Sequence, residues 1–531
     1  MKMKGIKIGV ALACLVLSGG VFMSCHKGQP SWNTQVLAPL VSANLSINDI
    51  ITSKYISSNP DSTVSLVYID SLYNISLVKI PDTTLFYDYV SPVSVNINPG
   101  GVIVPSHPTT TKYATGTAEL NKAVIQSGYL NVYIINALGQ TTDYSYTVPN
   151  VTKNSVPLQV SVAVTAHTKQ TLQIDLSGYT VDFTGPTHNS YNEVTTDLQI
   201  NLDASASSLT INPNDTVGHA QVTFSNIVPY YAKGYFGDDT TTYSAKQAFP
   251  VFSKIVAGTL SLQNCNVNLS LTNGVGVDAR LTLKQLSSYN SNTNNNVDLI
   301  APGLVQTTLN INRATETHNP SAPVNPTVQN FALNPGNSNI LTWLDNMPTS
   351  VGYNLHVETD PLGNVSGNND FVYYGYGISA VINVTIPLSL IANNLTLADT
   401  MAVNFGSSAN ASQHVKSGTL TIYANNGFPF SAGLQMLLLN DNNIVTDSIF
   451  IPSQTIAAGN IDAISGKVTS PQNSVLAISL DAIKTQELFN TKNVILYAKF
   501  NMGTLPSTYM KIYNYYKLGL KVVGNFEYQV N

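Results

Sequence analysis

The chain has 531 residues, of which 43% are hydrophobic and 10% are charged, and its formal net charge is −5. At roughly 100–200 residues per domain, this length indicates about three domains, each able to bury a core. The composition is too apolar for a disordered protein and too poor in charged helix formers for a coiled coil or a large helical bundle. With two arginines, Arg280 and Arg313, and no basic stripe, a nucleic-acid-binding role is also excluded.

Residues 1–24 have the organisation of a secretory signal peptide. Lys2, Lys4 and Lys7 precede an apolar stretch from Ile8 to Leu17. That stretch is shorter than the roughly 20 residues that a transmembrane helix needs. Small and turn-prone residues follow it, as is usual before a cleavage site. We therefore predict that the chain is exported and loses this segment.

The signal ends in Phe22-Met23-Ser24-Cys25, which resembles the lipobox of bacterial lipoproteins in its looser, Bacteroidota-type form. That resemblance implies cleavage before Cys25 and lipidation of its thiol and of the new amino terminus by acyl chains such as palmitate. Several acyl chains together anchor a protein stably to a membrane. The resemblance thus predicts a lipid-anchored protein of the cell envelope, at the outer membrane. An ordinary secreted protein with an incidental cysteine is the alternative.

The mature chain is expected to begin with a tether and N-terminal segment over residues 25–59. Loss of the three signal lysines takes the formal charge from −5 to −8. The run His26-Lys27-Gly28-Gln29-Pro30 contains no acid, whereas surface-exposed lipoproteins of Bacteroidota-like bacteria often carry acids at this place. By that resemblance the protein faces the periplasm, and the surface face stays open as an alternative.

Alternation of apolar and polar residues with a period of two recurs along the chain, which is the pattern of half-buried β-strands. Helical patterns are few and short. The sequence therefore predicts an all-β protein of tandem antiparallel β-sandwiches, immunoglobulin-like or similar. The clearest strands are Leu158–Val164, Leu172–Leu176, Leu198–Leu202, Ala279–Leu283 and Val494–Phe500, and the helical candidates are Val36–Val41, Asn339–Asn346 after Ser338, and Ala482–Phe489 after Asp481.

A weak internal repeat divides the exported chain into three. Each copy has an apolar strand ending in Pro, a later strand that starts with Gly, and a turn that contains Asn and leads into an alternating strand. Such order predicts three related sandwiches in tandem, over residues 60–190, 191–335 and 336–531. The marker residues are Pro81, Gly128 and Asn136; Pro229, Gly258 and Asn273; and Pro387, Gly418 and Asn426.

No sequence pattern points to catalysis. The eight histidines are widely spaced, and neither a metalloprotease box nor a Gly-x-Ser-x-Gly elbow is present. We therefore expect no enzyme, no catalytic residue, no cofactor and no metal site. A solvated loop explains the adjacent acids Asp238 and Asp239, with a calcium ligand as the alternative. Cys265, the sole thiol left after lipidation, is expected to be a small apolar residue in a strand.

Aromatic residues gather in a few short runs. In strands, half of such residues face the core or form cross-strand pairs, so packing is the favoured role. Exposed tyrosines near Asn can instead stack on sugars or anchor a protein interface. On that alternative, the candidate ligand platform is Tyr235, Phe236, Tyr374 and Tyr376.

Seven triplets of Asp, Ser or Thr, and an apolar residue or Thr resemble the O-glycosylation sites of exported Bacteroidota proteins. Asp-Ser and Asp-Thr are also common turn pairs, so both interpretations stay open. If the resemblance holds, glycans are attached to Ser62, Ser71, Thr83, Thr216, Thr240, Thr400 and Ser448.

Several short strings together resemble a family of Bacteroidota envelope lipoproteins, and no activity comes with that resemblance. The leading hypothesis is a membrane-anchored, non-enzymatic envelope lipoprotein with a structural or protein-interaction role and an envelope protein as its partner. A glycan-binding accessory lipoprotein of a polysaccharide-uptake system and a fimbrial or adhesin-type subunit are the alternatives. The strings are Trp32–Leu40, Leu45–Ile50, Gly234–Gly237, Pro361–Asn364, Asn369–Phe371 and Gly427–Pro429.

Overall fold

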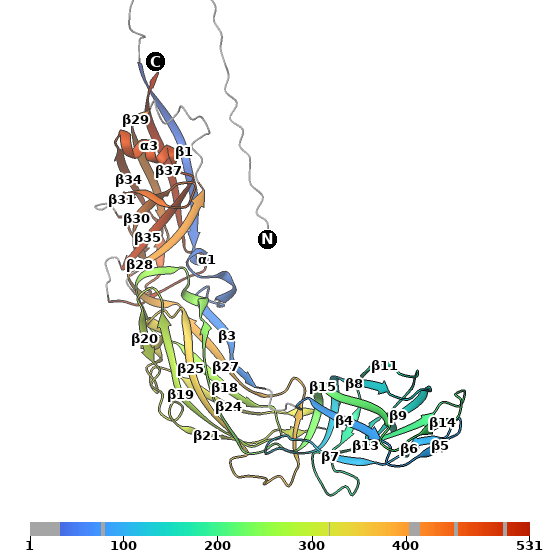
Figure 1. Ribbon diagram of the computed structural model, residues 1–531. Helices are drawn as coiled ribbons and strands as arrows, with labels where there is room; N and C mark the ends of the chain where they lie inside the picture. The colour runs from blue at the N-terminus through green and yellow to red at the C-terminus, as the bar shows by residue number, and fades with distance from the viewer. Residues whose placement is uncertain are drawn as a thin grey trace, which may run out of the picture.

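The computed structural model describes residues 32–75, 80–317, 319–402, 415–450, 455–462, 464–502 and 507–530. The strands form three sandwiches that follow one another in a curved row (Figure 1). We name them the terminal, middle and distal sandwiches, because the first contains both β1 (Trp32–Ser46) and β37 (Lys517–Val530). In these described ranges no helix has the length and apolar character needed to cross a membrane.

The terminal sandwich contains eight main strands, in two sheets. Counted in chain order, strands one, eight, three and six form the first sheet, and strands two, seven, four and five form the second. The first sheet is β1, β37, β29 (Val415–Asn426) and β34 (Gln472–Leu480), and the second is β28 (Ser389–Ala402), β35 (Asn493–Met502), β30 (Phe430–Leu439) and β31 (Val445–Phe450).

The middle sandwich repeats this order. One place, the fifth, is shared by two short strands that pair with different parts of the same neighbour. The first sheet is β3 (Val64–Ile75), β27 (Ile378–Pro387), β18 (Asn266–Asn273) and β24 (Thr327–Leu333), and the second is β16 (Asp239–Ala248), β25 (Ser350–Thr359), β19 (Ala279–Asn290) and β20 (Asn295–Asp298) with β21 (Thr308–Ile311).

The distal sandwich has the same order again, with its second place shared by two strands. A short extra strand, β12 (Thr180–Asp182), pairs with a strand of each sheet and joins the two. The first sheet is β4 (Thr83–Val90), β15 (Thr216–Tyr235), β8 (Glu119–Asn136) and β11 (Lys169–Asp175), and the second is β6 (Val102–Val104) with β7 (Thr109–Lys112), β13 (Glu193–Leu202), β9 (Thr142–Lys153) and β10 (Val156–Val164).

This strand order is that of a double-sheet jelly roll. The all-β sandwich architecture predicted from the alternating pattern is confirmed. The sandwiches are not of the immunoglobulin type, whose sheets contain a different set of strands.

The three jelly rolls are nested rather than consecutive. The first and eighth strands are neighbours in each: β1 pairs with β37, β3 with β27, and β4 with β15. The distal sandwich is therefore inserted between the first two strands of the middle one, which is itself inserted between the first two strands of the terminal one. The expected boundaries at 190/191 and 335/336 fall inside the distal and middle sandwiches, because strand pairing joins segments that are distant in sequence.

The internal repeat is visible in three buried asparagines, Asn136, Asn273 and Asn426, each with no exposed surface. Each is the last residue of the third strand of its sandwich. In all three, the side-chain oxygen accepts from the amide two residues on, at 2.9–3.0 Å. The side-chain amide donates to the carbonyl four residues on, at 2.8 Å, and to a carbonyl at the end of the fifth strand or in the loop after it. The glycine markers are less consistent. Gly128 and Gly418 lie on the third strands of their sandwiches, whereas Gly258 lies on β17 (Ile255–Leu262).

Two of the three expected helices are present. They are α2 (Ile340–Asp345) and α3 (Ala482–Asn490), both between the sixth and seventh strands of their sandwiches. Asp481 caps α3 by accepting from the amide of Lys484, whereas α2 is preceded by Asn339 rather than by the expected cap Ser338. The helix expected over Val36–Val41 is wrong: this segment belongs to β1, where pairing with β37 overrides the local pattern.

The remaining elements are short. Two of the strands extend a neighbouring sandwich: β17 pairs with β28 of the terminal sandwich, and β26 (Asp370–Tyr373) pairs with β15 of the distal one. The others are α1 (Ile47–Ile50), η1 (Ser53–Tyr55), η2 (Pro250–Phe252), β2 (Ile56–Ser58), β5 (Val95–Ile97), β14 (Leu209–Ile211), β22 (Thr315–Glu316), β23 (Val324–Asn325), β32 (Asn460–Ile461), β33 (Val468–Ser470) and β36 (Met510–Lys511).

Candidate functional site

The junction between the middle and distal sandwiches is formed by the loop 360–377, which joins β25 to β27. The loop contains β26, and this strand continues the distal sheet by pairing Asp370 with Gly234 and Tyr373 with Tyr231. The amide of Tyr374 donates to the carbonyl of Tyr230 at 2.7 Å. The loop of one sandwich is thus held by main-chain bonds to the edge of the other.

A small apolar cluster fixes the middle-sandwich side of this loop. Phe371 is buried against Ala314 and Val324, apart from the main core. The rings of Tyr231 and Tyr373 lie 4.7 Å apart, and the Tyr373 hydroxyl donates to Glu316 at 3.0 Å. These aromatic residues are packing groups of the junction.

The four residues of the candidate ligand platform all lie near this junction, but they do not form one exposed surface. Tyr235 and Phe236 are half-buried at the end of β15, and Phe236 packs against the main core. Tyr376 is half-buried against the small cluster, whereas Tyr374 is 59% exposed. The structure thus places these residues at a junction that the sequence did not predict, and their platform role stays a prediction.

A cluster of charged residues lies beneath the loop. The Asp370 side chain has no exposed surface, and Arg313 approaches it and Asp278 at 3.1 Å each. Asp360 is also buried, and its main-chain amide donates to the Asp278 carbonyl at 2.9 Å. Burial and the charge of Asp370 raise the pKa of the Asp360 carboxyl to about 8.

The guanidinium group of Arg313 therefore compensates the carboxylates of Asp278 and Asp370. Within the described parts of the chain, no group of three His, Cys, Asp or Glu side chains is placed to hold a metal. Asp238 and Asp239 are exposed where β16 begins. Cys265 is fully buried in the turn before β18, and burial raises the pKa of its thiol to about 11.

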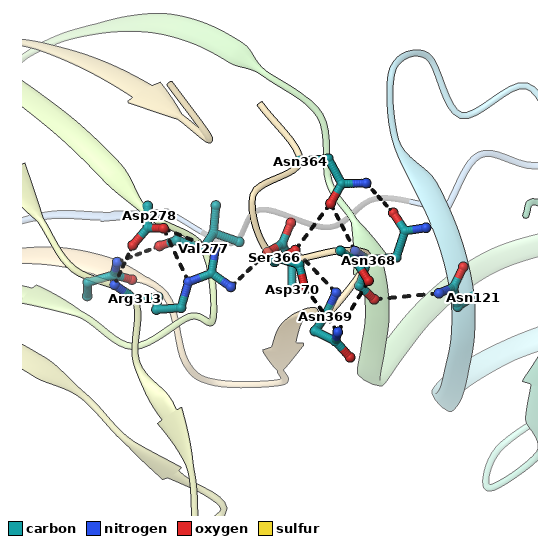
Figure 2. A network of polar contacts seen from close by, with 11 residues as sticks. Asn121, Val277, Asp278, Arg313, Asn364, Ser366, Asn368, Asn369 and Asp370 are labelled. Carbon is teal, nitrogen blue, oxygen red and sulfur yellow. Dashed lines mark hydrogen bonds and ion pairs between the residues drawn. The ribbon is translucent and has the colours of Figure 1, made fainter. Parts of the chain in front are cut away.

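The exposed end of loop 360–377 is braced by its own amide side chains (Figure 2). Asn364 accepts from the amide of Asn368 at 2.9 Å and donates to its side chain. Asn369 bonds to Ser366 through both its main-chain and side-chain nitrogens. The loop reaches the distal sandwich through Asn121 of β8, whose side chain lies 3.5 Å from the Asn368 carbonyl. This bracing gives the loop a defined surface.

A polar cleft of about 950 Å³ opens beside this loop, against the end of the distal sandwich. Its walls are the loop, five distal strands and the turn 184–188. Most of the lining groups are amides and hydroxyls, with two lysines, one aspartate and one histidine. The polar lining residues are Asn121, Lys122, Asn150, Thr152, Thr180, Asp182, Thr184, His188, Thr195, Lys233, Asn368 and Asn369.

Sequence reasoning did not single out the cleft residues, apart from Asn369 within a resemblance string. They come from separate strands and from a loop more distant in the chain, so no motif marks them. The seven predicted glycosylation residues lie elsewhere, and none is buried: Ser71, Thr216, Thr240 and Thr400 are exposed, and Ser62, Thr83 and Ser448 are half-buried. Their modification stays a prediction, and Cys25 lies outside the described residues.

No family model and no curated protein matches the chain. A solved structure of a Parabacteroides distasonis protein assigned as secreted is similar at 10% identity and a TM-score of 0.28, covering 93% of this chain and 99% of that one. A structure of Sulfolobus turreted icosahedral virus is similar at 10% identity and a TM-score of 0.12, covering 83% and 91%. Likenesses at these scores carry no argument about function.

Proposed function

We propose that the protein is a lipid-anchored lipoprotein of the cell envelope with a non-enzymatic binding role, and that the distal sandwich is its binding end. The lipobox-like sequence at Cys25 supports the anchor. The nested topology supports the assignment of ends, because Trp32 pairs with Val530 in the terminal sandwich. Cys25 stands only seven residues before Trp32, so a membrane anchor there lies next to the terminal sandwich.

The curved row then separates the distal sandwich from the anchored end (Figure 1). The chain enters the distal sandwich after β3 and leaves it before β16, and both of these strands belong to the middle sandwich. Such an arrangement suits presentation of a binding domain at a distance from the membrane. This architecture is the observation that carries the proposal.

A protein partner is the first candidate for what is bound. Phe86 on the edge strand β4 is 63% exposed, and it stands in one row with Gln221 and Tyr133 across the outer face of the distal sheet. The rings of Phe86 and Tyr133 flank His219, at 6.3 and 6.5 Å. Aromatic residues are enriched at the energetically important centres of protein interfaces.

Two experiments test these assignments separately. Membrane fractionation tests the anchor: the native chain should sediment with envelope membranes, and Cys25→Ala should release it; a variant that stays membrane-bound contradicts the anchor. Pull-down and cross-linking from envelope extracts test the partner. The pair Phe86→Ser and Tyr133→Ser should lose a partner that the control Tyr423→Ser, at an exposed tyrosine of the terminal sandwich, retains.

A glycan is the second candidate, and the polar cleft is the observation that favours it. Its amides and hydroxyls match the hydrogen-bonding groups of sugars. The fimbrial alternative has less support, because all eight strand positions of each described sandwich are filled by strands of this chain. Strand exchange between subunits uses an open position in a sheet.

A further inference from the structure

Two lysines stand side by side in the wall of the polar cleft. Lys122 of β8 and Lys233 of β15 are direct partners in the antiparallel register, and both line the cleft. Directly opposed residues project to the same face of a sheet, where like charges are destabilising. The fold thus holds two ammonium groups on one face in an otherwise acidic protein.

The aspartate beside them is engaged elsewhere. Asp182 of β12 stands opposite Lys122 on its other side. One Asp182 oxygen accepts from the amide of Thr184 at 2.9 Å, and the other lies 3.4 Å from His188. Among the ion pairs of the described residues, none includes Lys122 or Lys233. The cleft therefore holds two ammonium groups against the single carboxylate of Asp182.

Neutral hydrogen-bonding groups surround these lysines. Asn150 uses its side-chain oxygen to accept from the amide of Thr195 at 3.1 Å, which orients its NH₂ group as a donor. The braced loop adds Asn368 and Asn369 to the lining. A volume of about 950 Å³ lies near the upper end of the range, about 300–1,000 Å³, of small-molecule sites.

We propose that this cleft binds an acidic oligosaccharide, with sugar carboxylates on Lys122 and Lys233 and sugar hydroxyls on the surrounding amide and hydroxyl side chains. Lysine recognises an anion as a point charge, so an ion pair is formed without a fixed geometry. The lining residues in the described cleft include no Phe, Tyr or Trp, so recognition depends on charge and hydrogen bonds rather than on stacking against these rings. The inference deepens the glycan candidate above and does not depend on the anchor.

Calorimetric titration of the full mature chain carrying Cys25→Ala tests the site. The acidic probes are oligogalacturonate, oligoalginate and oligosialate. Methyl-esterified oligogalacturonate is the control that keeps the sugar and loses the charge. Free galacturonate distinguishes an oligosaccharide site from a site for any carboxylate. At least one acidic oligomer should bind more tightly than its monomer, and binding should weaken as salt rises. Lys122→Gln with Lys233→Gln should reduce the affinity by about tenfold or more.

The control is Lys169→Gln with Lys284→Gln, which removes the same charge at exposed positions outside the cleft and should bind normally. Circular dichroism of each variant establishes that it is folded. The proposal is overturned if the methyl ester or the monomer binds as tightly as the acidic oligomer, or if the cleft variant binds as tightly as the native chain. It is also overturned if no acidic oligomer binds at about 1 mM. None of these outcomes affects membrane anchoring or the protein pull-down, so failure here is distinguishable from failure of the proposed function.

Discussion

Arg313 lies 3.1 Å from Asp370, whose side chain has no exposed surface. The same guanidinium group contacts Asp278, so one cation neutralises two carboxylates under loop 360–377. A buried carboxylate left without its cation carries a large desolvation penalty. Because the loop also contains β26, the charge balance beneath it contributes to holding the distal sandwich against the middle one.

Replacing Arg313 by Met should therefore destabilise the junction by about 3–5 kcal/mol. Hydrogen exchange should increase in residues 360–377 and along β15, as measured by mass spectrometry, and the thermal midpoint should fall. Arg280→Met is the matched control, because Arg280 pairs with Glu358 at 3.0 Å where both side chains are about one-third exposed. Its loss should cost only about 0–1 kcal/mol. Equal effects of the two variants would contradict the role assigned to Arg313.

The buried carboxyl of Asp360 should make stability depend on pH. Its pKa is raised from 3.8 to about 8 by burial first and by Asp370 second, with Arg313 opposing the shift. The folded state therefore holds a proton that the unfolded state releases, and stability should fall as pH rises from about 4 to about 8, then level off. Asp345, with a pKa raised to about 6 by burial, adds to the lower part of this window.

The Asp360 contribution is isolated between pH 6 and 8. Asp360→Asn should flatten the fall in unfolding free energy there, measured by guanidinium titration at closely spaced pH values. Asp345→Asn should change the slope only below about pH 6. If Asp360→Asn leaves the whole profile parallel to that of the native protein, the assignment to this carboxyl is wrong.

Each repeat asparagine should stabilise its own sandwich. Asn426→Ala removes the side-chain donors to the carbonyls of Phe430 and Ala457. It also removes the acceptor of the Phe428 amide. The cost should be about 2–4 kcal/mol, since each unsatisfied buried group costs about 1–3 kcal/mol. Hydrogen exchange should increase in the terminal sandwich and not in the distal one. Asn425→Ala, at an exposed neighbour bonded only to the Asn473 side chain, is the control.

The corresponding substitution of Asn136 should act on the distal sandwich. If Asn136→Ala and Asn426→Ala lower the free energy of unfolding by similar amounts, each within its own sandwich, the repeated Asn turn has the same stabilising role in both. A small effect at either position would show that water replaces the lost bonds.

The sequence predicted the local features of this fold and not their connectivity. The alternation in Ala279–Leu283 marks a strand because the period of side chains on a pleated strand is two, whatever strand lies beside it. Nothing in that period tells which strand is the neighbour, so the pairing of β3 with β27 could not be anticipated. The Asn turns were recognisable because two bonds of each Asn side chain are to main-chain groups within four positions, whereas the third bond, to a distant carbonyl, was not recognisable.

The residues of the polar cleft could not be predicted from the sequence. Lys122 and Lys233 are more than a hundred residues apart and meet only through the register of β8 with β15. The aromatic run at Tyr373 was visible in the sequence because it is local, and packing was its favoured role, but the sequence did not show that it lies at a junction between two sandwiches. Its rings pack the junction, whereas the polar groups of the cleft lie beside it.

Cys265 gives a probe of local opening at the junction between the terminal and middle sandwiches. It lies between β17, which extends the terminal sheet, and β18, which belongs to the middle one. Its side chain has no exposed surface and burial raises its pKa to about 11, so at pH 8 both access and thiolate formation are suppressed. In the mature chain with Cys25→Ala, where Cys265 is the sole thiol, reaction with a thiol reagent should be slow and should reach one equivalent in guanidinium. Labelling that is as fast in the folded chain as in the unfolded one would contradict this burial. Asp345→Ala removes the acceptor of the Leu262 amide, and labelling that this variant accelerates would assign the opening to this junction.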